Sequence, residues 1–137
     1  MPTLFTRIIN GEIPGTFIYR DSLCVSFMTI NPITPGHALV LPIDEIDHWP
    51  DLSGELSAHL FGVAARIGKA QHLAFACKRV GLIIAGFEIP HCHLHLIPTN
   101  SMADMSFDHA AQNVAVPELE SAAGRIVAAM KKLEQSR

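Results

Sequence analysis

The chain has 137 residues, of which 49% are hydrophobic, and a formal net charge of −3 at pH 7. This length and composition predict a single domain with a substantial core and argue against a polar, disordered tail. The small negative charge, with no basic run, argues against general electrostatic capture of nucleic acid, although a single nucleotide needs only local donors. No segment approaches the roughly 20 apolar residues of a membrane span.

The three cysteines, Cys24, Cys77 and Cys92, are odd in number and widely spaced. They therefore predict neither a disulfide framework nor a CxxC metal clamp, a usage typical of a reducing compartment. The first residues also lack the cationic start and apolar run of a signal peptide. We expect a cytoplasmic protein that has no membrane partner.

The first forty residues read as short strands joined by turns. Aromatic and β-branched residues predict strands over 16–19 and 24–28, with a hairpin turn at 20–22 between them. A cluster of proline, asparagine and glycine at 31–36 breaks the pattern. It leads into a third strand, 37–42, which ends at its proline.

From Ser53 the hydrophobic period changes to steps of three and four residues. This pattern predicts an amphipathic helix that runs to about Ala76, with Ser53 as its N-cap. Its apolar stripe comprises Leu56, Leu60, Val63, Ile67, Ala70 and Ala74. A short apolar run predicts a buried strand over 80–85, and one tight turn around Gly86 leads to a last strand, 91–97.

Residues 99–115 carry no clear period and are expected to form an irregular loop. Pro117 suits the first position of a closing helix that reaches about residue 134. The apolar stripe of this helix comprises Leu119, Ala122, Ile126, Met130 and Leu133. The order of elements predicts an α+β domain in which helices pack on an antiparallel sheet.

Three histidines alternate strictly with apolar residues in the segment His91-Cys92-His93-Leu94-His95-Leu96-Ile97. Because side chains two apart in a strand share a face, this spacing would place three imidazoles on one face and apolar side chains on the other. The unperturbed pKa of histidine lies near working pH. A row of imidazoles on a rigid element therefore indicates a chemical site.

Three interpretations of this row compete. The histidines could lack a special role, or they could bind zinc or iron with a third ligand from Glu88, Glu45 or His37. In the third interpretation, a neutral imidazole attacks phosphorus and forms a covalent intermediate. The flanking imidazoles then hold its tautomer, donate hydrogen bonds to the phosphate oxygens and protonate the leaving group. The pattern favours this third interpretation.

The segment 91–97 resembles the hallmark of the histidine triad (HIT) superfamily, His-φ-His-φ-His-φ-φ with φ apolar. Residues 5–14 look like the family's opening segment, and residues 31–42 look like its Pro-Gly-His-x-Leu-Val-x-Pro strand. Residues 85–90 look like the lead-in to the triad. The likeness covers about residues 4–98 and is closest to the bacterial HINT-like branch, with a modified nucleotide-binding loop.

This resemblance implies a nucleotide-binding α+β fold with an antiparallel sheet of about five strands, one long central helix and a C-terminal helix. The whole chain, 1–137, would be one HIT-like domain, with a C-terminal extension that carries a helix at about 117–134. Family members are usually homodimers with a continuous sheet across the interface. The implied activity is hydrolysis or transfer of a nucleoside monophosphate, without a cofactor. The implied partner is a purine nucleotide or a nucleotide conjugate.

The resemblance also implies roles for single residues. His93 would be the nucleophile, His95 would contact the transferred phosphate, and His91 would orient His93, partly through its backbone carbonyl. His37 matches a fourth histidine that supports this network. An apolar base pocket carries over to Phe5, Ile8, Phe27 and Ile30, although such residues at strand spacing are also ordinary core.

Several positions depart from the family pattern. Thr29 stands where an acidic residue commonly holds the ribose hydroxyls, and an Asn-x-Gly loop before the triad is missing at 83–86. Phe87 replaces a glutamine. Glu88 replaces a phosphate-contacting group, and it would either donate a proton to the leaving group or repel the phosphate.

The lost donors open a rival interpretation, a nucleotide- or other small-ligand-binding protein with weak or lost catalysis. Thr3 and Thr6 stand where zinc-binding members have a cysteine pair, and Glu45 stands at a position that is often histidine. The resemblance therefore predicts no structural zinc.

Overall fold

The computed structural model describes residues 2–136 as a five-stranded antiparallel sheet packed with helices. The strand order is β1-β2-β3-β5-β4, and each neighbouring pair is antiparallel. This arrangement confirms the α+β class. The strands are β1 (Phe17–Arg20), β2 (Cys24–Met28), β3 (Ala38–Pro42), β4 (Arg79–Ile83) and β5 (Leu94–Thr99).

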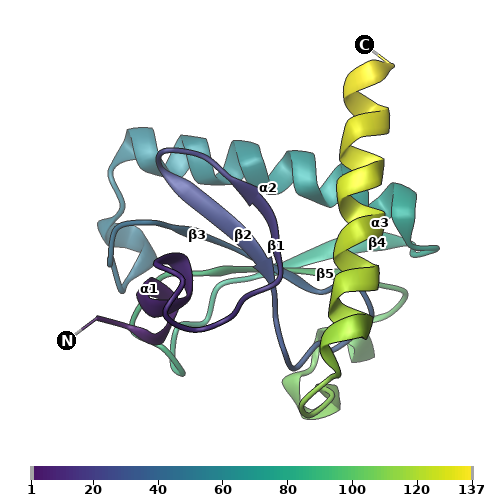
Figure 1. Ribbon diagram of the computed structural model, residues 1–137, viewed down its shortest axis with the longest axis horizontal. Coiled ribbons are helices and arrows are strands. Elements are labelled where there is room, and N and C mark those ends of the chain that lie inside the picture. Colours follow the sequence, from purple (N-terminus) through teal and green to yellow (C-terminus); the bar gives the residue numbers. More distant parts are fainter. Residues whose placement is uncertain (1, 137) are drawn as a thin grey trace.

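The two faces of the sheet pack against different helices. The larger core lies between the sheet and two long helices, α2 (Gly54–Ala74) and α3 (Val116–Gln135). The short helix α1 (Leu4–Ile9) covers part of the opposite face, and Figure 1 shows α1 and α2 on opposite sides of the strands. The second, smaller core on the α1 side comprises Phe5, Ile9, Val25, Phe27, Leu39 and Leu41.

Helix α2 forms as its sequence pattern predicts. The Ser53 hydroxyl accepts a hydrogen bond from the Leu56 amide at 3.1 Å, which satisfies one of the free amides of the first turn. The predicted stripe faces the core: Leu60, Val63, Ile67 and Ala70 are buried, and Leu56 and Ala74 pack at its edge. Burial of each leucine or isoleucine side chain stabilises the folded state by about 1.5–3 kcal/mol.

Helix α3 packs on α2 and crosses its C-terminal end (Figure 1). It begins at Val116, so Pro117 occupies its second position; a proline is tolerated there because amides of the first turn have no intrahelical partner. The residues it buries in the main core are Leu119, Ala123, Ile126 and Ala129. None of the helices within residues 2–136 combines the length and apolarity that crossing a membrane requires.

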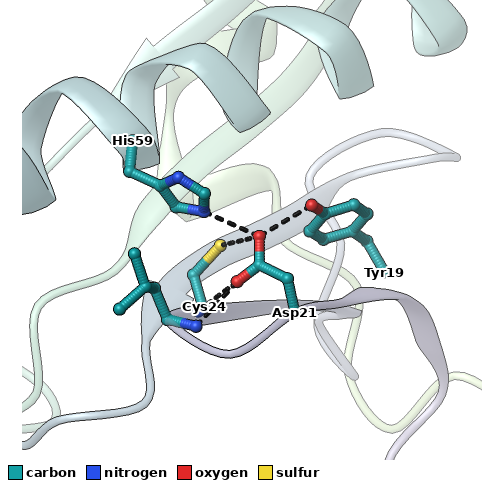
Figure 2. A network of polar contacts seen from close by, with 5 residues as sticks. Tyr19, Asp21, Cys24 and His59 are labelled. Atoms are coloured by element: carbon teal, nitrogen blue, oxygen red, sulfur yellow. Dashed lines mark hydrogen bonds and ion pairs between the residues drawn. The ribbon is translucent and has the colours of Figure 1, made fainter.

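The hairpin between β1 and β2 is fixed by Asp21, whose contacts are drawn in Figure 2. One carboxylate oxygen accepts the amides of Leu23 and Cys24, both at 2.8 Å. The other oxygen accepts the Tyr19 hydroxyl at 2.7 Å and the His59 Nε2–H at 2.6 Å, which ties the turn to α2. Burial alone would raise the pKa of Asp21, but these hydrogen bonds outweigh it and hold the pKa below its ordinary value.

Two elements differ from the sequence prediction because distant contacts decide them. The opening residues, for which the sequence predicted no helix, form helix α1, and the Thr3 hydroxyl caps it by accepting the Thr6 amide at 3.1 Å. Strand β4 was predicted to be buried, but it is a half-exposed edge strand, since nothing pairs with its outer side within residues 2–136.

Two connections also differ. The link from β4 to β5 spans residues 84–93, not a single tight turn, although Gly86 does adopt a positive φ of 83°. The segment 99–115, expected to be irregular, contains the 3₁₀ helices Met102–Met105 and Phe107–His109.

Candidate functional site

The structure brings the four predicted histidines together on the α1 side of the sheet. Strand β5 starts at Leu94, so His91 and His93 lie in the segment just before it and only His95 lies within the strand. The rings still form a row: His93 and His95 have centroids 4.9 Å apart, and His95 and His37 are 5.1 Å apart. Pairing of β3 with β5 sets Leu39 opposite His95, which brings His37, two residues earlier, to the same face.

The tautomer of His93 follows from its neighbour. Its Nδ1 lies 2.7 Å from the backbone carbonyl of His91. A carbonyl oxygen only accepts, so Nδ1 carries the proton and donates it to this bond. In the neutral ring, Nε2 is then unprotonated and presents a lone pair. This is the form in which an imidazole acts as a nucleophile.

The tautomer of His95 is opposite, and a backbone amide sets it. The Ile33 amide donates to His37 Nδ1 at 3.0 Å, so neutral His37 carries its proton on Nε2. That Nε2–H faces His95 Nδ1 at 2.9 Å and donates to it. Neutral His95 therefore carries its proton on Nε2. The row presents one acceptor, on His93, beside one donor, on His95.

Burial keeps the supporting rings uncharged. Desolvation lowers the pKa of His37 to about 4, and desolvation together with the neighbouring imidazoles lowers the pKa of His95 to about 3. Burial also lowers the pKa of His91, against opposing effects of the Pro42 carbonyl and Glu45. The donor on His95 is therefore a neutral N–H at working pH.

The two outer nitrogens remain within reach of solvent. The His93 and His95 side chains are largely enclosed, at 3% and 6% exposure. Within residues 2–136, no hydrogen bond uses either Nε2 atom, and the only fully buried side-chain nitrogen or oxygen without a partner is Oε1 of Gln71. Both Nε2 atoms must then lie at the surface of the site, where a small ligand can meet them.

The segment that carries the four histidines matches a known protein family. The model of the HIT domain matches residues 10–102, which include all four histidines. The chain belongs to the HIT family. Members of this family are nucleotide-binding proteins that are generally hydrolases or transferases. The family match confirms the resemblance found in the sequence.

Several HIT proteins are similar to this chain over most of its length. An uncharacterised HIT-like protein of Methanocaldococcus jannaschii is 36% identical over 101 residues, which cover 69% of this chain and 77% of that protein. The purine nucleoside phosphoramidase of Escherichia coli is 31% identical over 109 residues, 75% of this chain and 92% of that enzyme. A solved zinc-bound histidine triad family protein from Mycobacterium smegmatis has a TM-score of 0.83 at 25% identity, covering 98% of this chain and 96% of that one.

The positions that zinc-binding HIT members fill with ligands do not suit zinc in this chain. Thr3 and Thr6 offer hydroxyls in place of thiolates, and their hydroxyl oxygens lie 3.2 Å apart. Glu45 accepts the Thr3 amide at 2.7 Å. The histidine row offers no third ligand either, because hydrogen bonds already engage both nitrogens of His37 and of His91.

The residues predicted for the base pocket of this HIT protein fall into two groups. Phe5, Ile8 and Phe27 lie in the smaller core, and the Phe5 ring contacts His93 edge-on, with centroids 4.9 Å apart. Ile30 lies outside that core and is 57% exposed. Glu88 is also exposed, in the link between β4 and β5. The structure therefore places apolar side chains beside His93, whereas Ile30 and Glu88 are exposed to solvent.

No sequence pattern predicted two contacts of the site. Phe107, from the C-terminal extension, lies edge-on against His95, with ring centroids 4.9 Å apart. The extension is held there by the amides of Ala111 and Val114, which donate to the carbonyls of Pro32 and Ile30. The hydroxyl of Thr3 is the second contact, at 2.8 Å from His91. Both depend on residues far apart in the chain.

The neutral histidines make stability sensitive to mild acid. In the unfolded chain the pKa of these imidazoles is about 6.5, so below that pH they bind protons in the unfolded state. In the folded state His37 and His95 stay neutral, because burial lowers their pKa. The free energy of unfolding should be highest above pH 6.5. It should fall by about 1.4 kcal/mol per pH unit for each of these histidines as the pH drops towards 4.

Urea unfolding at pH 7, 6 and 5 measures this slope. His37→Gln should flatten it, whereas His72→Gln, at an exposed position of α2, should leave it unchanged. A stability that stays constant between pH 7 and pH 5 would contradict the neutral, buried state of these rings.

Proposed function

We propose that this HIT protein is a nucleotidyl hydrolase or transferase. It would cleave a phosphoramidate, or an ester or anhydride of a nucleoside monophosphate, through a covalent intermediate on His93. The observation that carries the proposal is the pairing of two nitrogens of opposite character at the surface: the lone pair of His93 Nε2 and the neutral N–H of His95. This pair fits a phosphoryl group, which needs a nucleophile and an oxygen-binding donor side by side.

In the first step, His93 Nε2 attacks phosphorus, and the bond from phosphorus to the leaving nitrogen or oxygen breaks. The charge that develops on the His93 ring is stabilised by its Nδ1–H bond to the His91 carbonyl. His95 donates to a phosphate oxygen. A proton from solvent passes to the leaving nitrogen or oxygen. In hydrolysis, a water molecule then attacks phosphorus, the bond between phosphorus and His93 Nε2 breaks, and the attacking water releases its proton to solvent.

The substrate we propose is a purine nucleotide or a nucleotide conjugate. The apolar side chains of Phe5, Ile8 and Phe27 beside His93 support a base on that side. The Escherichia coli relative, a purine nucleoside phosphoramidase, supports the same class. Phe107 would border the opposite side of the phosphate, next to His95.

We also propose that the protein forms a homodimer through strand β4. Strand β4 is an edge strand with unpaired backbone groups on its outer side within the described chain. Leu82 on this strand is exposed, and Phe87 in the following link is 95% exposed. Exposed apolar residues along a sheet edge favour pairing with a second copy, which would extend the sheet across the interface.

The second candidate is a ligand-binding protein with weak or lost catalysis. Thr29 favours it, because its hydroxyl accepts the Asn31 amide at 3.2 Å and is partly occupied within its own loop. Phe87 adds no hydrogen-bond donor. These positions weaken the hold on a ribose, which a catalytic site uses to orient its substrate.

Incubation with adenosine 5′-phosphoramidate separates the two candidates. An enzyme should release AMP, and rapid acid-free quenching followed by peptide mass mapping should show AMP bound to the segment that contains His93. Calorimetry with AMP gives the binding readout alone. Binding of AMP without release of AMP from the phosphoramidate and without an adduct would establish the second candidate. A protein that neither binds AMP nor turns over the phosphoramidate would contradict both candidates.

A further inference from the structure

His91 is held at both ring nitrogens, and one of the two partners is a side chain from the opposite end of the chain. Its Nε2 lies 2.7 Å from the Pro42 carbonyl, which only accepts, so Nε2 carries the proton. Nδ1 of the neutral ring is then an acceptor. The Thr3 hydroxyl lies 2.8 Å from it and donates the bond.

Other contacts leave the Thr3 hydroxyl little freedom. Its oxygen accepts the Thr6 amide at 3.1 Å, and the Thr3 amide donates to Glu45 at 2.7 Å. Hydrogen bonds from the Thr6 hydroxyl and the Thr3 amide lower the pKa of Glu45, which keeps it a carboxylate. The single hydroxyl proton of Thr3 has two acceptors within reach, His91 Nδ1 at 2.8 Å and the Thr6 hydroxyl oxygen at 3.2 Å, and the shorter contact is the one to His91.

The geometry points to Thr3 as a positioning residue for the nucleophile, acting through His91; this inference depends on the function proposed above. The Thr3 hydroxyl and the Pro42 carbonyl fix the His91 ring from two sides. The carbonyl of the same residue, His91, accepts the Nδ1–H of His93 at 2.7 Å. Loss of one ring contact would let the backbone of His91 shift with its side chain, and the carbonyl of that backbone sets the tautomer and direction of His93. Helix α1 thus holds the site by a hydrogen bond as well as by the apolar contact of Phe5 with His93.

Three substitutions test this role. Thr3→Val keeps the shape of the side chain but removes the donor, and kcat on the phosphoramidate should fall about tenfold while KM stays nearly constant. Thr3→Ser restores the donor and should lie within about twofold of the wild type. Thr6→Val is the matched control: it removes the neighbouring hydroxyl and spares the bond to His91, so it should also lie within about twofold.

A spectroscopic readout separates positioning from general damage. Long-range proton–nitrogen NMR of the imidazoles should show a single His91 tautomer, protonated at Nε2, in the wild type and in Thr3→Ser. Thr3→Val should show a mixture. Because Thr3 also caps α1, Thr3→Gly serves as a second donor-free variant, since glycine is tolerated at an N-cap.

The outcomes are distinct. Wild-type kcat and an unchanged His91 tautomer in Thr3→Val or Thr3→Gly would overturn the inference. A loss in Thr3→Ser as large as that in Thr3→Val would overturn it as well, because packing would then explain the effect. If the wild-type protein fails to turn over the phosphoramidate, the proposed function fails, but the NMR measurement still tests whether Thr3 sets the His91 ring.

Discussion

His93→Ala is expected to reduce turnover of adenosine 5′-phosphoramidate by at least about 10³-fold and to abolish the covalent adduct, with the fold intact. The substitution removes the lone pair that attacks phosphorus, and no other imidazole can replace it. The outer nitrogen of His95 is protonated, and both nitrogens of His91 and of His37 are engaged. Steady-state release of AMP measures the effect.

Two further variants serve as controls for the loss of activity in His93→Ala. His93→Asn keeps an N–H that can donate to the His91 carbonyl, so it should fold like the wild type and be as inactive as His93→Ala. His72→Ala removes an exposed imidazole from α2 and should leave turnover unchanged. Full activity in His93→Ala would show that the covalent mechanism is wrong.

Gly36→Ala is expected to destabilise the protein by about 3 kcal/mol or more. Gly36 has a φ of +90°, a conformation that costs an L-residue roughly 1–2 kcal/mol. A Cβ at this position would also lie 2.5 Å from the Phe75 ring, which is buried in the main core. Either the ring or the turn must move, and overpacking of this kind typically costs a further 1–3 kcal/mol.

Gly11→Ala is the matched control, because Gly11 has a φ of +82° and nothing within 4 Å of the added Cβ. It should cost only about 1–2 kcal/mol, the conformational part of the effect. Urea unfolding of both variants at pH 7 gives the difference. Equal losses in the two variants would show that Phe75 yields without strain. Because His37 follows Gly36 directly, the larger strain should also lower turnover.

The periodic patterns of the sequence predicted the fold class correctly because they act over a few residues. Helix α2 needed only its three- and four-residue apolar steps and the Ser53 cap, both of which are local. Strand β2 has the predicted bounds of 24–28. Helix α1 was missed because its six residues form a helix only when Phe5 and Ile9 find the smaller core.

The alternation of His91, His93 and His95 by itself indicated which residues build the site. The predicted strand 91–97 was correct only from Leu94 onward, because His91 and His93 lie in the segment before β5. The tertiary structure alone decided what each nitrogen does. Proton positions depend on the Pro42 carbonyl, the Ile33 amide and the Thr3 hydroxyl, which lie far from the triad in sequence. An imidazole can carry its proton on either nitrogen at little cost, so only the fixed donors and acceptors of the fold assign a nucleophile to His93 and a donor to His95.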